Sequence, residues 1–373
     1  MSVWRSLRIP PEELRLDTTL KCGQAFRWKV SGESQWSCAF KGRFITLRQK
    51  DSDIEYQSYF PIKKSSDEVD HEFELIDNFL MDYFNLSSKI NLRECYDRWS
   101  MADKHFAKIA CQFKGIRILR QDPVENLFCF ICSTNNNIAR ISQMIEKLCN
   151  KYGNLVYTLN GQEFYDFPTL DKLVSSNVES ELRQLGFGYR AKYITQTAKF
   201  LMENYSDAEK WLYSLRNVDY KVAHSALLKF SGVGPKVADC VCLMSLDKHN
   251  AIPIDTHVWQ IAQREYGFNS KSSTKTLTSR LYEAIGDHFR NLFGDYSGWA
   301  HSVLFTADLK AFQDRPSSFT TIDTNIDTTL SKNDLDSSIL LDSDKIVITK
   351  KRSRSKNIQK ESILLSNKKI KRF

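Results

Sequence analysis

The sequence has no long apolar run. No stretch of about 18 consecutive apolar residues occurs in its 373 residues, which excludes a membrane-spanning helix. The opening residues, MSVWRSLRIPP, contain too short an apolar part for a secretory signal. They carry arginines and no acidic residue before Glu12, so a mitochondrial presequence stays open. We expect a chain that does not associate with membranes.

Cysteines are too irregular in number and spacing to form a disulfide framework. Nine of them, an odd number, are scattered along the chain, which fits free thiols in a reducing compartment. Cys129 and Cys132 are spaced C-x-x-C, but they lie in the apolar, helical run LFCFIC, so we expect small core residues. No ligand spacing supports a zinc or iron site. We therefore predict no metal ion and no other cofactor.

A general excess of basic residues is also missing. Residues 345–373 have a formal charge of +10 and the preceding 344 residues have −2, so the net charge of +8 comes from the tail. Ser, Thr, Asp and Asn dominate residues 313–373, where no apolar periodicity survives, and this composition predicts disorder. Two basic clusters there, residues 350–356 and 368–372, are typical of nuclear import or of nonspecific attraction to DNA.

The rest of the chain shows two patterns. From about residue 15 to residue 60 apolar residues alternate, as Trp36, Cys38 and Phe40 do, which predicts an antiparallel sheet with one covered face. From about residue 73 onward helical spacing dominates. We predict an α+β fold in three parts: an N-terminal antiparallel sheet with flanking helices in residues 1–115, a mainly helical region in residues 116–312 against which it packs, and a disordered basic tail in residues 313–373.

Residues 220–257 have the pattern of a helix, a glycine hairpin, a second helix and a capped helix start. Gly232 and Gly234 suit a tight turn, and Pro235 suits a first helical position, where no backbone donor is needed. Backbone amides at such a turn converge on a concave site, and the following helix adds its positive end. The stretch therefore predicts a clamp for a DNA phosphate.

Two residues of this stretch suggest chemistry. Lys236 lies just inside the second helix, where burial and the helix dipole both favour a free, nucleophilic amine. Asp255 stands at the next helix start, where it caps the helix. A lysine nucleophile with a carboxylate suits the removal of a nucleobase, because the carboxylate stabilises a positively charged sugar and the amine takes C1′ as a Schiff base. A solvated helix-start lysine is the alternative that the spacing leaves open.

Five ordered blocks resemble the helix-hairpin-helix DNA glycosylases, and among them the eukaryotic 8-oxoguanine DNA glycosylase/AP lyase. They cover about the first 310 residues and are CGQAFRW at 22–28, STNNNIAR at 133–140, LGFGYRAKY at 185–193, FSGVGPKVADC at 230–240 with IPIDTH at 252–257, and GWAHSVLF at 298–305. The resemblance implies a bifunctional repair enzyme. It would excise 8-oxoguanine opposite cytosine through a Lys236 Schiff base, assisted by Asp255, and then cleave the abasic site by β-elimination.

The resemblance also implies roles for the residues of these blocks. Contacts to the flipped base would come from Gly23, Cys240, His301 and Phe305. Contacts to the DNA would come from Asn135, Arg140, Tyr189, Arg190, Gly232, Gly234, Val237 and His257. The Gly23 carbonyl would recognise the N7 hydrogen of 8-oxoguanine, Asn135 and Arg140 would contact the unpaired cytosine, and Cys240 would stack on the base or pair with the lysine as a thiolate.

The residues alone leave plainer interpretations open. Gly23 fits a strand bulge, the three asparagines at 135–137 fit helix caps, Tyr189 with Arg190 fits an exposed turn, and Phe305 fits the core. His301 departs from the family pattern, which usually has glutamine there. Imidazole offers one donor and one acceptor, so it imitates an amide only in part, and its titration makes the preferred base less secure than the reaction.

The partner implied is double-stranded DNA that contains oxidised guanine, bound by a monomer. Some relatives in this superfamily carry an iron–sulfur cluster on a four-cysteine loop, but no cysteine follows Asp255, so we expect none here. The basic clusters predict the nucleus, with the mitochondrion as a second compartment left open. Two other functions stay open: a helix-hairpin-helix glycosylase for another damaged base, against which Lys236 argues, and a non-catalytic helix-hairpin-helix DNA-binding module.

Overall fold

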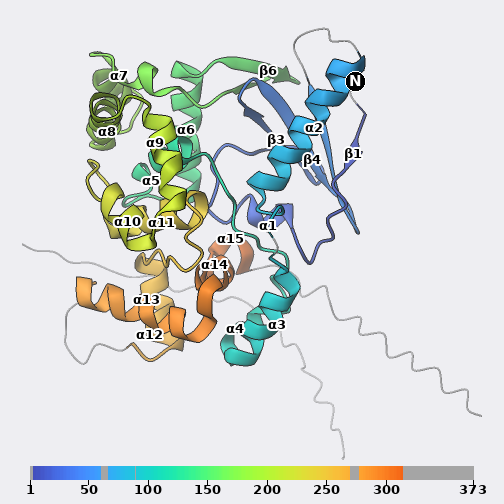
Figure 1. Ribbon diagram of the computed structural model, residues 1–373, viewed down its shortest axis with the longest axis vertical. Coiled ribbons are helices and arrows are strands. Elements are labelled where there is room, and N and C mark those ends of the chain that lie inside the picture. The colour runs from blue at the N-terminus through green and yellow to red at the C-terminus, as the bar shows by residue number, and fades with distance from the viewer. Residues whose placement is uncertain (1–2, 60–65, 89, 269–276, 314–373) are drawn as a thin grey trace, which may run out of the picture. The chain divides into compact units, whose positions relative to one another are not determined.

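A computed structural model describes residues 3–59, 66–88, 90–268 and 277–313 (Figure 1). All of these residues belong to the compact unit Met1–Thr321. The predicted disorder and both basic clusters of the tail fall on residues 314–373 and lie outside the described residues. No helix in the described part of the chain is long and apolar enough to cross a membrane.

The N-terminal part is the predicted antiparallel sheet. Its five strands have the order β1-β5-β4-β3-β2 and are β1 Arg5–Ser6, β2 Lys29–Gly32, β3 Gln35–Phe40, β4 Arg43–Gln49 and β5 Ile54–Tyr59. Trp36, Leu47 and Tyr56 stand opposite one another across three strands and are buried together. The alternation of apolar residues predicted this covered face, but the expectation of only one covered face is wrong, because Ala39 and Phe44 on the opposite face are buried against Phe164 of the second sheet. The strand bounds differ from the expected range of 15–60, because the short strand β1 precedes it, residues 16–19 form a short helix and the next strand starts only at Lys29.

Helices make up most of the remaining chain. They are α1 Leu16–Thr19, α2 Ser66–Tyr83, α3 Leu92–Ala102, α4 Lys104–Ala110, α5 Pro123–Ile131, α6 Ile138–Tyr152, α7 Val178–Gln184, α8 Arg190–Asn204, α9 Ala208–Ser214, α10 Tyr220–Leu227, α11 Pro235–Ser245, α12 Thr256–Glu265, α13 Ser279–Phe293, α14 Ser297–Asp308 and α15 Lys310–Gln313. A second sheet interrupts them, a hairpin of β6 Leu155–Leu159 and β7 Gln162–Tyr165 that the sequence analysis did not predict.

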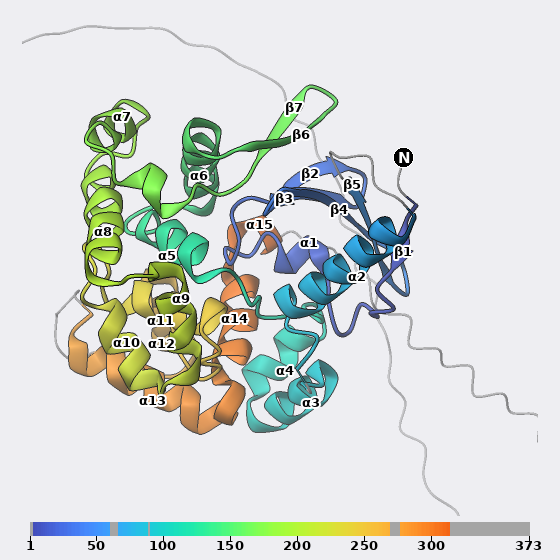
Figure 2. The same cartoon turned by 45° about the horizontal axis from the view of Figure 1, so that its top comes forward.

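Two large apolar cores divide the fold. The first lies between the covered face of the sheet and α2, which runs across that face (Figures 1 and 2). The second fills the helical region and also takes in α3 and α4, which pack against α13 and α14. Helices that precede residue 116 thus share the core of the helical region. The boundary between residues 115 and 116 stays a prediction.

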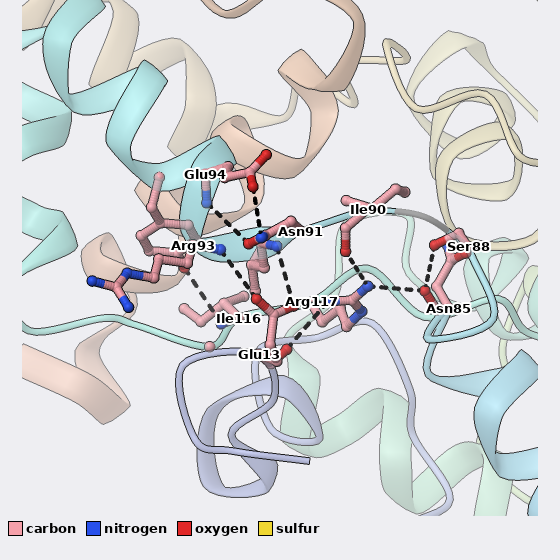
Figure 3. Close-up of polar contacts among 12 residues, drawn as sticks. Glu13, Asn85, Ser88, Ile90, Asn91, Arg93, Glu94, Ile116 and Arg117 are labelled. Carbon is pink, nitrogen blue, oxygen red and sulfur yellow. Dashed lines mark hydrogen bonds and ion pairs between the residues drawn. The ribbon is translucent and has the colours of Figure 1, made fainter. Parts of the chain in front are cut away.

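A buried ion pair between Glu13 and Arg117 joins the N-terminal segment to the start of α3 (Figure 3). The Arg117 guanidinium donates to Glu13 Oε2 at 2.7 Å and to the carbonyls of Asn85 and Ile90 at 3.0 and 2.9 Å. The guanidinium carbon of Arg117 also lies 5.5 Å from the ring centre of Trp299 in α14. The Glu13 carboxylate in turn accepts the first backbone amides of α3. Because Arg117 is 1% exposed, its charge depends on these partners.

Candidate functional site

The glycine hairpin joins α10 to α11, as the sequence predicts. Gly232 has φ +80°, and a Cβ there would lie 2.5 Å from the Tyr193 ring, so only glycine fits. Gly234 differs from the expectation: its φ is −98° and a Cβ would meet nothing within 4 Å. The turn therefore requires one glycine, and Gly234 instead begins α11 as its N-cap.

Among the described residues, no N-cap side chain accepts from the backbone amides at the start of α11. Pro235 occupies the first helical position, as predicted, and Gly234 has no side chain to cap the amides that follow. The amides of Lys236 and Val237 therefore point out of the helix with its positive end behind them, which suits an anion. The Val237 side chain is buried, so this residue meets a phosphate only through its backbone.

A pocket brings all the predicted catalytic and base-binding residues together. It lies where the bend before β2, the start of α11, the start of α12 and the middle of α14 meet. Its walls are Cys22, Gly23, Gln24, Phe130, Lys236, Cys240, Met244, Pro253, Asp255, His301, Ser302, Phe305 and Thr306. Gly23, Lys236, Cys240, Asp255, His301 and Phe305 are thus neighbours although 282 positions separate the first from the last.

Lys236 is held by two partners that the sequence analysis missed. Its Nζ lies 3.2 Å from Ser133 Oγ and 5.1 Å from the ring centre of Phe130. The Ser133 hydroxyl donates to the Phe130 carbonyl at 2.7 Å, so its oxygen is oriented to accept from the lysine. Ser133 follows α5 and carries no local signal of this role, since a serine at a helix end is ordinarily a cap or turn residue.

Asp255 caps α12, as predicted. Its Oδ1 accepts from the amides of His257 at 2.9 Å and Val258 at 3.0 Å. Both bonds use the same oxygen, so Oδ2 has no hydrogen-bond partner in the described part of the chain. One carboxylate oxygen therefore fixes the residue, and the other is available to a positive charge in the pocket.

Cys240 lies one helical turn after Lys236 and is buried. Burial raises the pKa of its thiol to about 11, and Lys236 opposes this rise only in part. The residue carries its proton at neutral pH. Of the two predicted roles, the raised pKa favours a neutral wall for the base over a thiolate partner of the lysine.

His301 and Phe305 form one wall of the pocket on α14. Their rings are nearly parallel, with an interplanar angle of 23° and centroids 6.5 Å apart, and Phe289 packs edge-on against His301. Burial lowers the pKa of His301 to about 4, although Asp255 partly counteracts the shift. Neither ring nitrogen has a hydrogen-bond partner in the described residues. His301 is thus a neutral imidazole with one donor and one acceptor unused.

Gly23 lies in a bend before β2 and not in a strand, so both the expected strand position and the bulge are wrong. Its φ is +87°, and a Cβ would approach Ile138 Cδ1 to 3.0 Å. The residue must be glycine to follow this path. Its backbone borders the pocket directly.

The three asparagines between α5 and α6 have different positions. Asn137 caps α6 by accepting from the Arg140 amide at 2.9 Å, and Asn136 donates to the Cys132 carbonyl, also at 2.9 Å. Asn135 is exposed and has a left-handed backbone with φ +48°. Two of the three therefore have the structural role that the residues alone suggested. Asn135 is the one whose side chain remains available.

Tyr189 and Arg190 reach the same loop from the start of α8. The Tyr189 hydroxyl donates to the Thr134 carbonyl at 3.1 Å, and Arg190 donates to the carbonyls of Thr134 and Asn135. Tyr189 is 44% exposed, whereas Arg190 is 3% exposed. Arg190 therefore orders the loop that carries Asn135, and its own DNA contact stays a prediction.

Arg140 and His257 are both exposed. Arg140 is in the first turn of α6, close in sequence to Asn135. The His257 ring packs edge-on against Phe305 at 6.1 Å, and its Nδ1 lies 4.0 Å from a carboxylate oxygen of Asp308. Their contacts to DNA stay predictions.

A glycine hairpin directly before a pocket that contains a half-buried lysine and a half-buried carboxylate is the arrangement of the helix-hairpin-helix class of base-excision DNA glycosylases. Residues 128–286 match the family described as HhH-GPD superfamily base excision DNA repair protein, and residues 6–127 match the 8-oxoguanine DNA glycosylase N-terminal domain. The chain belongs to the 8-oxoguanine DNA glycosylase/lyase family, as the sequence motifs indicated.

Three relatives document this membership. The N-glycosylase/DNA lyase OGG1 of Arabidopsis thaliana is 41% identical over 310 residues, 83% of this chain and 81% of that protein. The N-glycosylase/DNA lyase of Saccharomyces cerevisiae is 37% identical over 331 residues, 81% of this chain and 85% of that protein. The Clostridium acetobutylicum 8-oxoguanine glycosylase/lyase, solved with double-stranded DNA containing cytosine opposite 8-oxoguanine, is 29% identical with a TM-score of 0.65 and covers 79% of this chain and 91% of that one.

Proposed function

We propose that Lys236 is the nucleophile and Asp255 the assisting carboxylate of an 8-oxoguanine N-glycosylase/DNA lyase. Glycosylase and lyase activity on 8-oxoguanine in double-stranded DNA is the function of this family, and the chain is an enzyme of that type. The observation that supports these roles is the common pocket of the two residues, next to uncapped amides that suit a DNA phosphate.

The proposed reaction begins when the Nζ lone pair of Lys236 attacks C1′ of the flipped nucleotide. The C1′–N9 bond breaks, and the leaving base takes one of the two protons of Nζ. The other Nζ proton passes to O4′ as the C1′–O4′ bond breaks and the sugar ring opens, which gives an imine between Nζ and C1′. Removal of a C2′ proton then breaks the C3′–O bond, which cleaves the strand, and water hydrolyses the imine to return the lysine.

Asp255 acts in this scheme through its unpaired oxygen. Positive charge develops on the sugar as the glycosidic bond breaks, and a fixed carboxylate stabilises it without reorganisation. The hydrogen bonds from His257 and Val258 hold the carboxylate in place. The Ser133 hydroxyl orients the amine, because its own proton is already given to a carbonyl.

The base is recognised, in this proposal, by the other walls of the pocket. The carbonyl of Gly23 accepts the N7 hydrogen that 8-oxoguanine has and guanine lacks. Phe305 and the neutral Cys240 thiol sandwich the ring. His301 meets the base edge with one donor and one acceptor, which is supported by its two unpartnered ring nitrogens inside the pocket.

The opposite strand is contacted by the loop between α5 and α6. Asn135 enters the space that the flipped base leaves, and Arg140 contacts the unpaired cytosine beside it. Support comes from the exposure of both side chains and from the hydrogen bonds that Tyr189 and Arg190 make to this loop. Tyr189 wedges the duplex, as enzymes that extrude a base require. His257 adds a phosphate contact to the amides of the hairpin.

Borohydride trapping tests the proposal. Duplexes with 8-oxoguanine opposite each normal base are incubated with the protein, with and without borohydride, and covalent adducts and strand breaks are counted. Trapping concentrated on the cytosine pair is expected. Lys236→Gln is expected to bind the lesion duplex but to give no adduct and no cleavage, and full activity of this variant would refute the nucleophile assignment. Asp255→Asn is expected to bind equally and to slow base release about a hundredfold or more.

For localisation, we propose the nucleus as the main compartment. The support is the pair of basic clusters at 350–356 and 368–372. A chain ending at residue 313 is expected to excise the base normally from short duplexes and to lose nuclear accumulation in cells. Unchanged accumulation of the shortened chain would contradict the proposal.

A further inference from the structure

A buried carboxylate lies beneath the lysine–carboxylate pocket and is not part of its walls. Asp239 is on α11, three residues after Lys236, and is 1% exposed. Tyr220 on α10 donates to its Oδ1 at 2.6 Å, and Tyr282 on α13 donates to its Oδ2 at 2.5 Å. A buried carboxylate requires such donors, because water does not reach it. Three helices therefore meet at one side chain.

Of these two tyrosines, only Tyr282 also forms a hydrogen bond with the segment that precedes Asp255. The backbone amide of Ile254 donates to Tyr282 Oη at 3.3 Å, and the same hydroxyl lies 3.4 Å from the Ile252 carbonyl. Because the single Tyr282 proton goes to Asp239, the Ile254 bond is the only hydrogen bond to the backbone of residues 252–254 within the described part of the chain. This segment has no regular secondary structure, so its position depends on that contact and on the burial of its isoleucines.

We infer that Asp239 and Tyr282 are positioning residues that fix the distance between Lys236 and Asp255. The connection runs from Lys236 along a rigid helix to Asp239, through the Tyr282 hydroxyl to the Ile254 amide, and so to the next residue, Asp255. A phenol has one proton, so donation to Asp239 leaves its oxygen to accept from Ile254, and the directions of the two bonds agree. The inference rests on the proposed roles of Lys236 and Asp255.

The structure supplies a matched pair of variants. Tyr282→Phe and Tyr220→Phe each remove one hydroxyl from the same carboxylate, and only the first also releases Ile254. Both are expected to lower the midpoint of thermal unfolding by a similar few degrees. Because small misplacements of catalytic groups cost large factors in rate, Tyr282→Phe is expected to slow single-turnover base excision about tenfold at saturating enzyme. Tyr220→Phe is expected to remain within about twofold of the unchanged protein.

Two further measurements make the outcome decisive. Amide hydrogen exchange at Ile254 is expected to accelerate in Tyr282→Phe and not in Tyr220→Phe, which reports the lost contact even if stability also changes. Asp255→Asn is assayed beside them. The positioning inference is overturned, and the proposed function stands, if Asp255→Asn excises slowly while Tyr282→Phe excises at the rate of the unchanged protein. The same conclusion follows if Tyr282→Phe and Tyr220→Phe are slowed equally. If Asp255→Asn is itself fully active, the proposed role of Asp255 fails and the inference falls with it.

Discussion

Replacing His301 with glutamine changes the pH dependence of stability in a direction that the structure sets. His301 is buried, and burial lowers its pKa to about 4 from an ordinary value of 6.5. Between these pH values the unfolded chain binds a proton at His301 that the folded chain does not. The contribution of His301 to the free energy of unfolding is therefore fully present above pH 6.5 and is lost as the pH falls towards 4. From about pH 7.5 to about pH 5 the loss amounts to about 2 kcal/mol for this one group.

The assay is urea unfolding of the unchanged protein and of His301→Gln at several pH values across that range. Glutamine does not titrate, so the difference in unfolding free energy between the two proteins is expected to shift by about 2 kcal/mol in favour of the variant as pH falls. Subtracting the two curves removes the contribution of every other titrating group that the substitution leaves alone. A difference that stays constant with pH would refute the burial of a neutral imidazole at this position.

Further substitutions test how the site is supported. Gly232→Ala is expected to lower the unfolding free energy by about 2 kcal/mol, because alanine is strained at φ +80° and its Cβ meets the Tyr193 ring. Gly234→Ala is the control and is expected to lower it by less than about 1 kcal/mol. Equal losses for the two variants in urea unfolding would contradict the assigned hairpin geometry. Glu13→Gln is expected to cost about 3 kcal/mol, since it leaves the Arg117 guanidinium buried without its counter-charge, and a loss below about 0.5 kcal/mol would show that the pair is not needed.

Local patterns predicted well those parts of the protein in which neighbours in sequence determine the structure. The hairpin between α10 and α11, the N-cap at Asp255 and the covered face through Trp36, Leu47 and Tyr56 all follow from spacing and residue type. The hairpin of β6 and β7 had a signal too, since Asn160 and Gly161 both adopt positive φ in its turn and Asn-Gly favours such turns. It was missed because helical spacing surrounds it.

Contacts between distant segments had no comparable signal. Ser133 reaches Lys236 across 103 positions, and Tyr282 reaches Asp239 across 43. Ser133 is a turn residue after α5 and Tyr282 is an ordinary residue within α13, so neither residue type alone indicates a contact with a distant segment. The same holds for Asn135 and Arg190. Hydrogen bonds within the loop leave the Asn135 side chain exposed and hold the Arg190 side chain against the loop backbone, and the sequence gives no signal of these bonds.

The pocket also explains why an N-terminal sheet belongs to an enzyme whose proposed chemistry lies on helices. Gly23 and Lys236 line the same pocket, so the proposed recognition of the base by Gly23 requires that the bend around Gly23 stays at a fixed distance from α11. Gln24 holds that bend in place through three hydrogen bonds of 3.0 Å. Its side-chain amide donates to the Arg117 carbonyl and accepts from the Leu119 amide, and the Gln121 side chain donates to the backbone carbonyl of Gln24. Since Gln24 is 1% exposed, these bonds exchange little with water. The residues proposed for base recognition and for catalysis thus lie in different parts of the chain, and the buried hydrogen bonds of Gln24 hold the two parts at a fixed distance.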